Sequence, residues 1–161
     1  MNRTIALLVA GLLAAASLGA TAAAPSLRIV DAWARATPPG APTGVIYLTV
    51  VNDGQATDRL LGASTPAAAK AEPHTMSMTN MIMTMRPAKD GLPVPAHGRL
   101  MLSPSGDHLM LTGLKGPLKT GTKLALTVRF AGAGPVKVEV PVRDNAPAGA
   151  AISGHDHMHM H

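Results

Sequence analysis

Histidine and methionine are the residues of this sequence that could do chemistry, and one segment, 74–85, is dense in them. It reads HTMSMTNMIMTM and contains one His and five Met. If the segment is extended, alternate side chains share a face. Two rows of donors follow: His74, Met76 and Met78, then Met81, Met83 and Met85. Thioether sulfur is a soft ligand and imidazole suits copper, so the pattern indicates a Cu(I) site. Methionines that only fill a core are the alternative, but Leu, Ile or Val would pack a strand better.

A hairpin turn inside this segment would bring the two rows together. Asn tolerates the left-handed conformation that two-residue turns need, so we expect the turn at Thr79-Asn80. Three rungs follow from that turn: Met78 opposite Met81, Met76 opposite Met83, and His74 opposite Met85. Since opposed residues have Cβ atoms roughly 4.5–5.5 Å apart, an imidazole and a thioether would converge at one end of the hairpin.

A shorter cluster, His108-Leu109-Met110, follows further along the chain. Alternation places His108 and Met110 on one face, whereas Leu109 and Leu111 on the other would anchor the strand in the core. His97, in contrast, lies in a loop with no His or Met two residues away. We interpret His97 as a solvated surface residue.

The last seven residues form a further candidate metal-binding segment. Its donors are His155, His157, Met158, His159, Met160 and His161. Such a composition is typical of metal binding: neutral imidazoles would favour Cu(II), Ni(II) or Zn(II), and the thioethers could help to hold Cu(I). A purification tag is the alternative, but a tag would be pure His. Residues 144–154, which are rich in Ala and Gly, are expected to be a flexible linker.

The N-terminus has the pattern of a secretory signal. Arg3 provides a positive start, residues 5–16 are apolar, and small residues follow. We expect cleavage after Ala22 and export to the periplasm. An uncleaved anchor is the alternative, although the apolar run is short for a membrane span, and no other run approaches it. Three parts follow: a signal peptide at 1–24, a copper-binding domain at 25–143, and a linker with a His/Met-rich tail at 144–161.

The composition excludes several classes of protein. The 161 residues include no Cys, so disulfides, a blue-copper centre and a thiol reductase site are ruled out for this chain alone. The net charge is +5, but the basic residues are spread out and aromatic residues are scarce, which disfavours nucleic-acid binding. Acidic residues are few and scattered, and no Ser-His-Asp pattern occurs, so we expect a binding protein and not an enzyme.

Short alternating segments separated by Gly- and Pro-rich turns make up the domain. Strands are expected at 27–35, 43–52, 58–64, 70–78, 81–87, 99–102, 108–111, 122–130 and 136–142. The stretch 92–98 is expected to be a proline-rich connector, and no stretch has the pattern of an amphipathic helix. The sequence therefore predicts an all-β antiparallel sandwich or small barrel with a core of Val, Leu, Ile and Ala.

The motifs of the chain resemble the periplasmic copper chaperones of the PCu(A)C type. The matching stretches read WARATPPGAPTGVIYLTVVN, HTMSMTNMIMTMRP, GDHLMLTGLKGPLKTGTKLALTVRF and VKVEVPV, within residues 31–142. The family motif of His, ten residues, Met, about twenty-one residues and His-x-Met is matched by His74, Met85 and His108, with twenty-two residues between the last two. A loop between them could accommodate the extra residue at little cost.

The resemblance implies a cupredoxin-like Greek-key β-sandwich or barrel that carries Cu(I). The implied ligands are His74, Met85, His108 and Met110, with Met76 and Met83 as auxiliary residues of a second rung or hand-over surface. It also implies delivery of copper to a partner, foremost the binuclear copper centre of cytochrome oxidase, while the tail could capture Cu(II). The alternative is a periplasmic copper buffer or resistance protein that sequesters copper through the domain and the tail.

Overall fold

The computed structural model describes residues 26–147, which form ten strands and no helix. The strands are β1 Leu27–Arg35, β2 Thr43–Asn52, β3 Asp58–Ser64, β4 Ala68–Thr79, β5 Ile82–Pro87, β6 Leu92–Val94, β7 Gly98–Leu102, β8 His108–Leu114, β9 Lys123–Phe130 and β10 Gly134–Arg143. The predicted all-β class is confirmed. A membrane-spanning helix does not occur within this described range.

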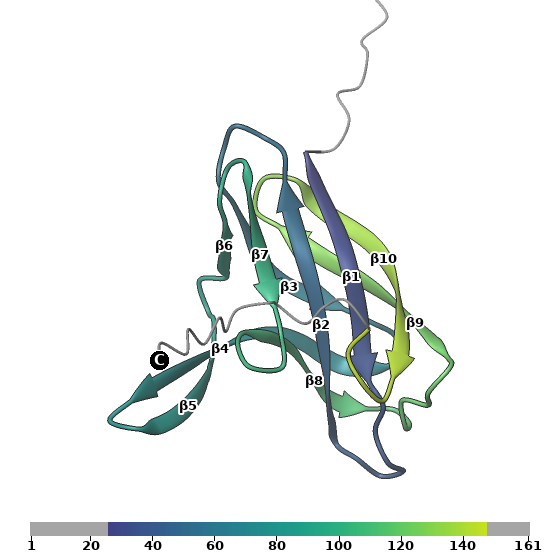
Figure 1. The fold of residues 1–161 in the computed structure, drawn as a ribbon. Coiled ribbons are helices and arrows are strands. Elements are labelled where there is room, and N and C mark those ends of the chain that lie inside the picture. The colour runs from purple at the N-terminus through teal and green to yellow at the C-terminus, as the bar shows by residue number, and fades with distance from the viewer. Residues whose placement is uncertain (1–25, 148–161) are drawn as a thin grey trace, which may run out of the picture.

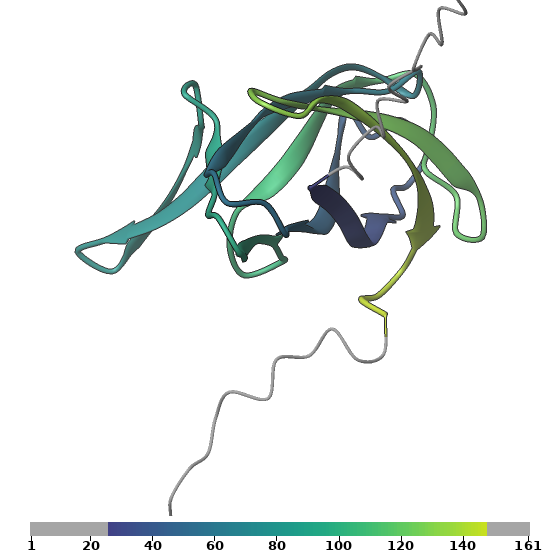
Figure 2. The ribbon, with the colours of Figure 1, turned by 90° about the horizontal axis from the view of Figure 1, so that it is seen from above.

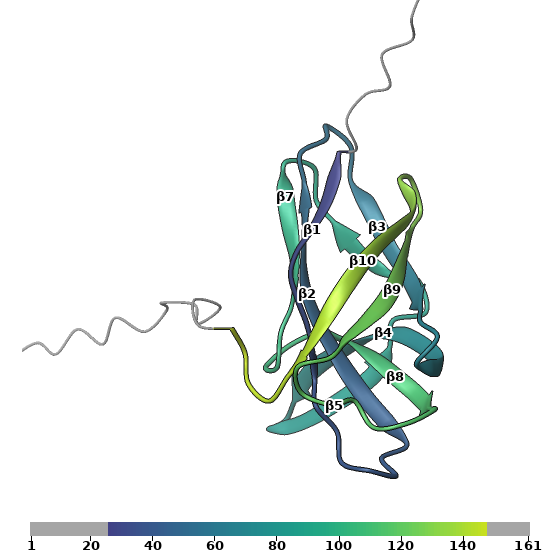
Figure 3. The same ribbon diagram turned by 90° about the vertical axis from the view of Figure 1, so that its right-hand side faces the viewer.

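Seven strands close into a barrel (Figures 1 and 2). Their order is β4-β8-β2-β1-β10-β9-β3, and β3 returns to β4 where Ala63 pairs with Ala71. β1 and β10 run parallel and lie side by side in Figure 3, whereas the other neighbouring strands of the barrel are antiparallel. β7 pairs with β2, and β6 pairs with β3. The barrel thus holds β4 and β8, the strands that carry the two His-containing motifs, next to each other.

Aliphatic side chains at alternate positions fill the barrel. In β9, alternate residues from Leu124 to Phe130 are buried while Lys123 and Arg129 are exposed, as predicted. Each fully buried Leu or Val contributes about 1.5–3 kcal/mol. Trp33 and Tyr47 are also buried, but they pack on each other with ring centroids 4.8 Å apart and do not belong to the aliphatic cluster.

One predicted connector is a strand. Leu92–Val94 forms β6, which pairs with β3 at the end of the sheet and was expected to be part of a proline-rich loop. Pro93 lies opposite Arg59 on this terminal strand. Proline has no N–H to donate and is tolerated at sheet edges, while Leu92 and Val94 on either side are buried. Alternate burial therefore outweighed the proline signal.

The methionine-rich hairpin extends beyond the barrel. β4 pairs with β8 from Ala68 to His74 and then continues to Thr79 with only β5 beside it. Figures 1 and 2 both show the β4–β5 hairpin projecting from one side of the barrel. Half of β4 is thus part of the barrel wall and the other half is an exposed arm.

Candidate metal centre

The turn of the hairpin lies at Asn80-Met81, one residue later than predicted. Both residues have positive φ, 52° and 62°, as a type I′ turn requires. Asn80 takes the first left-handed position, as it does in Asn-Gly turns, and Met81 takes the second. The observed rungs are Met78 opposite Met83, Met76 opposite Met85 and His74 opposite Pro87. The predicted rungs, including His74 opposite Met85, are therefore wrong.

The faces of the hairpin agree better with the sequence prediction than its register does. Moving the turn by one residue displaces each pairing by two positions, which returns every strand side chain to the same face. Met76, Met78, Met83 and Met85 thus share one face, as predicted. On the opposite face the hydroxyl oxygens of Ser77 and Thr84 lie 2.9 Å apart and are hydrogen-bonded. Met81 was expected to join the row, but it lies in the turn and is 94% exposed.

β8 supplies the residue that lies beside His74 on the other edge of β4. His74 pairs with His108, and Glu72 pairs with Met110, so both motifs present their donors on one face. The two imidazole ring centroids are 6.1 Å apart and the rings are tilted by 32°. A metal ion bound by one nitrogen of each ring requires a centroid separation of about this size, since metal–imidazole nitrogen bonds are about 2.0–2.1 Å long in zinc sites.

His74 carries a buried nitrogen that the described protein atoms leave unsatisfied. Its Nδ1 has no hydrogen-bond partner among them, and such atoms are rare because they cost about 1–3 kcal/mol. Burial lowers the pKa of His74, His108 lowers it further, and Glu72 partly offsets both. The imidazole therefore stays neutral to lower pH than an ordinary His, which favours metal binding because the ligand must be unprotonated.

His108 is oriented by the loop that precedes β8. The side chain is only 6% exposed, and its Nδ1 lies 3.1 Å from the carbonyl oxygen of Gly106. A carbonyl only accepts hydrogen bonds, so Nδ1 is the donor, and in the neutral ring this leaves the lone pair on Nε2. Metal-binding His residues are commonly held in this way by a second hydrogen bond.

Thioethers flank the two imidazoles along the strands. Met76 and Met85 form the next rung towards the hairpin tip, and Met110 lies two residues from His108 in the other direction. Residues one rung apart on neighbouring strands are within reach of long side chains. Met83 is a further rung away. The structure places the four predicted ligands on one face of three neighbouring strands, and Met76 lies on the same rung of the ladder as Met85.

This donor set is soft. Among residues 26–147, no three His, Cys, Asp or Glu side chains converge as metal ligands, whereas two imidazoles and several thioethers share this face. Such a combination suits copper, and thioethers favour Cu(I). The side chains change from buried at His108 to 46% exposed at Met85, so one side of the site faces solvent.

Comparison with known proteins identifies the family of this chain. Residues 27–142 match the model of the family described as "Putative lipoprotein LpqE-like". The chain belongs to this LpqE-like family. A relative from Leifsonia xyli subsp. xyli (strain CTCB07), "Putative lipoprotein Lxx21020", is 34% identical over 168 residues, covering 96% of this chain and all of the relative.

Solved structures of similar proteins include copper-binding members. The Cu(I) form of DR1885 from Deinococcus radiodurans is 34% identical with a TM-score of 0.58, covering 81% of this chain and 86% of that one. The copper-bound PCuAC domain from PmoF2 is 22% identical with a TM-score of 0.61, covering 74% and 94%, and this similarity concerns the fold. The predicted cupredoxin-like fold and the resemblance to the PCu(A)C type are confirmed.

Asp107 is a residue of the LpqE-like chain that sequence reasoning missed. Its Oδ1 accepts a hydrogen bond of 3.2 Å from the backbone N–H of Met76, at the point where the pairing of β4 with β8 stops and β4 continues with only β5 beside it. The contact joins residues that are 31 positions apart. No sequence motif indicates it, because Asp before a strand usually reads as part of a turn. Asp107 thus fixes the base of the hairpin beside the paired histidines.

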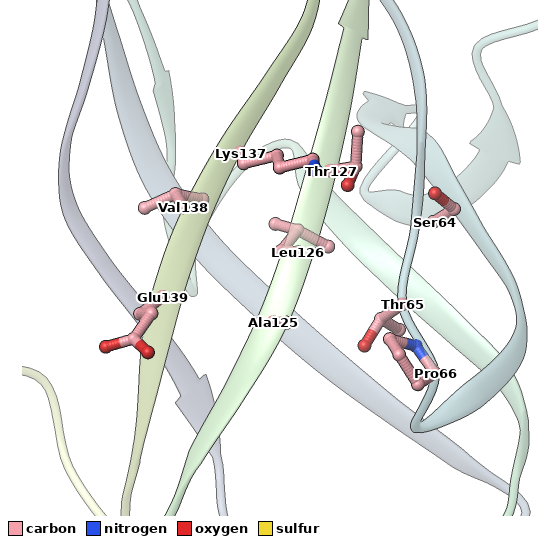
Figure 4. Close-up of a pocket in the computed structure, with 9 residues that line it drawn as sticks. All are labelled: Ser64, Thr65, Pro66, Ala125, Leu126, Thr127, Lys137, Val138 and Glu139. Carbon is pink, nitrogen blue, oxygen red and sulfur yellow. The ribbon is translucent and has the colours of Figure 1, made fainter.

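A separate groove of about 640 Å³ lies among strands that carry no candidate ligand. Figure 4 shows Ser64, Thr65 and Pro66 on one side of β9 and Lys137 with Glu139 on the other. Its lining contains no His or Met, so it lacks the soft donors of the centre on β4, β5 and β8.

The remaining predicted residues lie apart from this centre or outside the described residues. His97 is exposed in a turn with φ of 50°. The signal segment 1–24 and the tail donors from His155 to His161 fall outside residues 26–147, so the tail as a copper-binding segment stays a prediction.

Proposed function

We propose that this LpqE-like protein is a periplasmic copper chaperone that binds Cu(I) and passes it to a partner. Its ligands would be His74, Met85, His108 and Met110. The observation that carries the proposal is the opposed pair of imidazoles, one with an unsatisfied buried Nδ1, beside thioethers on the same face. Copper is the cargo here. It would be bound and passed on as Cu(I) with no change of oxidation state, so the proposed role is binding and not catalysis.

The burial of the donors supports transfer rather than permanent storage. His108 is almost fully buried, whereas Met85 is nearly half exposed on the projecting hairpin. A thioether on the exposed arm can be replaced by a ligand of another protein while the imidazoles still hold the metal. Met76, which pairs with Met85, would serve as a further ligand during this exchange.

We assign the recipient and the compartment by family resemblance. The N-terminal signal pattern supports export, and the family is associated with the binuclear copper centre of cytochrome oxidase. The His/Met-rich tail would collect copper and raise its concentration near the domain, because a tether gives a high effective concentration.

X-ray absorption of the Cu(I) form tests the ligand set. The full chain, with the tail His and Met residues replaced by Ala, is loaded with one equivalent of Cu(I). We expect both nitrogen and sulfur neighbours, and loss of one sulfur in Met85→Leu. Met83→Leu is the matched control on the same strand, and it should leave the spectrum unchanged. A spectrum that Met83→Leu alters and Met85→Leu does not would contradict the assignment.

A deletion strain tests delivery. At limiting copper, cells without this protein should assemble less of the binuclear copper centre of cytochrome oxidase, and the wild-type gene should restore it. Restoration should fail with a His74→Ala/His108→Ala variant. Normal assembly in the deletion strain, together with increased copper sensitivity, would instead identify a buffer.

A further inference from the structure

The outer edge of β5 has no neighbouring strand within residues 26–147. β5 ends the sheet order, and within residues 26–147 it pairs only with β4. Such an edge presents unpaired backbone N–H and C=O groups that can pair with an additional strand. In a folded protein such an edge is either protected against pairing with other chains or used to bind a partner strand.

The turn determines which backbone groups of β5 point outward. The residues that flank a two-residue turn form a hydrogen-bonded pair, and bonded and non-bonded pairs then alternate along an antiparallel ladder. The N–H of Ala88 donates to the carbonyl of Pro73 at 2.8 Å, which fits this alternation. The N–H and C=O groups of Met83 and Met85 therefore point away from β4, towards the free edge.

The inner edge of the hairpin obeys the same alternation but is partly occupied. Met76 pairs with Met85 in a non-bonded pair, so its N–H points away from β5, and there it meets the carboxylate of Asp107. The outer groups of Met83 and Met85 have no such cap among the described residues. Strand addition is thus open on the outer edge beside these two residues.

Side chains of an added strand would reach the face of the hairpin that carries Met83 and Met85. Residues directly opposite Met83 and Met85 would place their side chains on the same face as these thioethers, with Cβ atoms roughly 4.5–5.5 Å away. Alternate residues of the incoming strand would therefore lie beside Met85, which is one rung from His74. A backbone interaction would in this way position ligands for exchange.

Exposure and charge indicate what would bind. Five of the seven exposed large hydrophobic side chains in residues 26–147 belong to this hairpin: Met78, Met81, Ile82, Met83 and Met85. Residues 80–89 also contain Arg86 and Lys89 but no Asp or Glu. An apolar and cationic surface favours an acidic partner, whereas a second copy would bring like charges together.

We propose that β5 is a strand-addition site for an extended, acidic segment of the copper-exchange partner, with Met, His or Cys at alternate positions. The backbone of Met83 and Met85 would bind this segment and the alternate soft side chains would receive or donate the copper. The inference rests on the proposed copper-chaperone function and deepens it, since it specifies how the partner docks.

The test uses the full chain and a blocked nine-residue peptide that alternates Met with Thr and has Glu at both ends. In Met83→Pro the outward N–H is removed, and proline is tolerated there because no bond to β4 is lost. Met83→Leu is the matched control, since it also lacks the thioether but keeps the N–H. We expect the peptide to bind Met83→Pro roughly tenfold more weakly than Met83→Leu.

Hydrogen exchange gives a second readout that does not depend on the variant folding. On the wild-type chain the peptide should slow exchange at the amides of Met83 and Met85, and a peptide N-methylated at alternate residues should not. Equal binding of the peptide to both variants, or no added protection, would overturn the proposal. So would a concentration-dependent dimer abolished by Met83→Pro, which would identify a second copy as the occupant.

Copper titration separates this inference from the proposed function. Met83→Pro and Met83→Leu should bind Cu(I) equally tightly, because both variants lack the Met83 thioether. If the wild-type domain bound no Cu(I) while the peptide still protected the β5 edge, the proposed function would fail and the docking edge would stand. If copper bound normally and the edge stayed unprotected, only the docking inference would fail.

Discussion

Replacing His74 and His108 together by Ala lowers the Cu(I) affinity of the domain by more than about a hundredfold. Mutating a residue that only hydrogen-bonds to a metal ligand typically lowers metal affinity by about 10–100-fold. Loss of two direct ligands should therefore lower it by more. The measurement is competitive Cu(I) titration of the full chain with the tail His and Met residues replaced by Ala. His97→Ala is the matched control, since His97 is exposed in a turn.

Folding of the variants can be judged from the same structure. The Nδ1 of His74 has no hydrogen-bond partner among the described residues, so His74→Ala removes an unsatisfied buried atom. We therefore expect the metal-free His74→Ala chain to resist urea at least as well as the wild type. Unchanged copper affinity in the double variant would refute the paired-histidine site, whatever its stability.

Leu109→Ala lowers the free energy of unfolding by about 2–5 kcal/mol, as is typical when a buried Leu is truncated and a cavity remains. Leu109 is 0% exposed, and it lies between His108 and Met110 in sequence while pointing into the barrel. The measurement is urea unfolding of the metal-free chain. Leu61→Ala is the control, because Leu61 is 43% exposed and its truncation should change stability by at most about 0.5 kcal/mol.

Cu(I) should partly restore the free energy of unfolding of the Leu109→Ala chain. Cu(I) that binds only the folded state adds about 2.7 kcal/mol at a free concentration one hundred times its dissociation constant. A loss below about 1 kcal/mol in the metal-free chain would contradict the placement of Leu109 in a packed core. An equal loss in Leu61→Ala would also contradict it.

Most of the fold could be predicted from the sequence because alternation is local. The expected strands at 27–35, 43–52 and 58–64 match β1, β2 and β3, since the apolar residues recur with the period of two that a pleated strand imposes. β6 was missed because its two proline-flanked apolar residues are too few to show that period. Its burial depends on β3, which lies about thirty residues earlier.

The candidate site was also only partly predictable from the sequence. Residue identity and the alternation of side chains along a strand place His74, His108 and the thioethers on particular strand faces, and both can be read from the sequence. The turn position is not, because Asn80 can occupy either central position of a two-residue turn. Moving it by one residue preserved every strand face but replaced the expected partner of His74.

The sequence by itself determined which donors this protein has and which face of each strand they occupy, since both follow from residue identity and a period of two. Only the tertiary structure decided that His74 lies opposite His108, that Asp107 holds Met76, and that no strand within residues 26–147 covers the outer edge of β5. These are contacts, or the absence of a neighbour, between segments far apart in the chain. They depend on which strands become neighbours when the barrel closes, and local alternation carries no information about that choice.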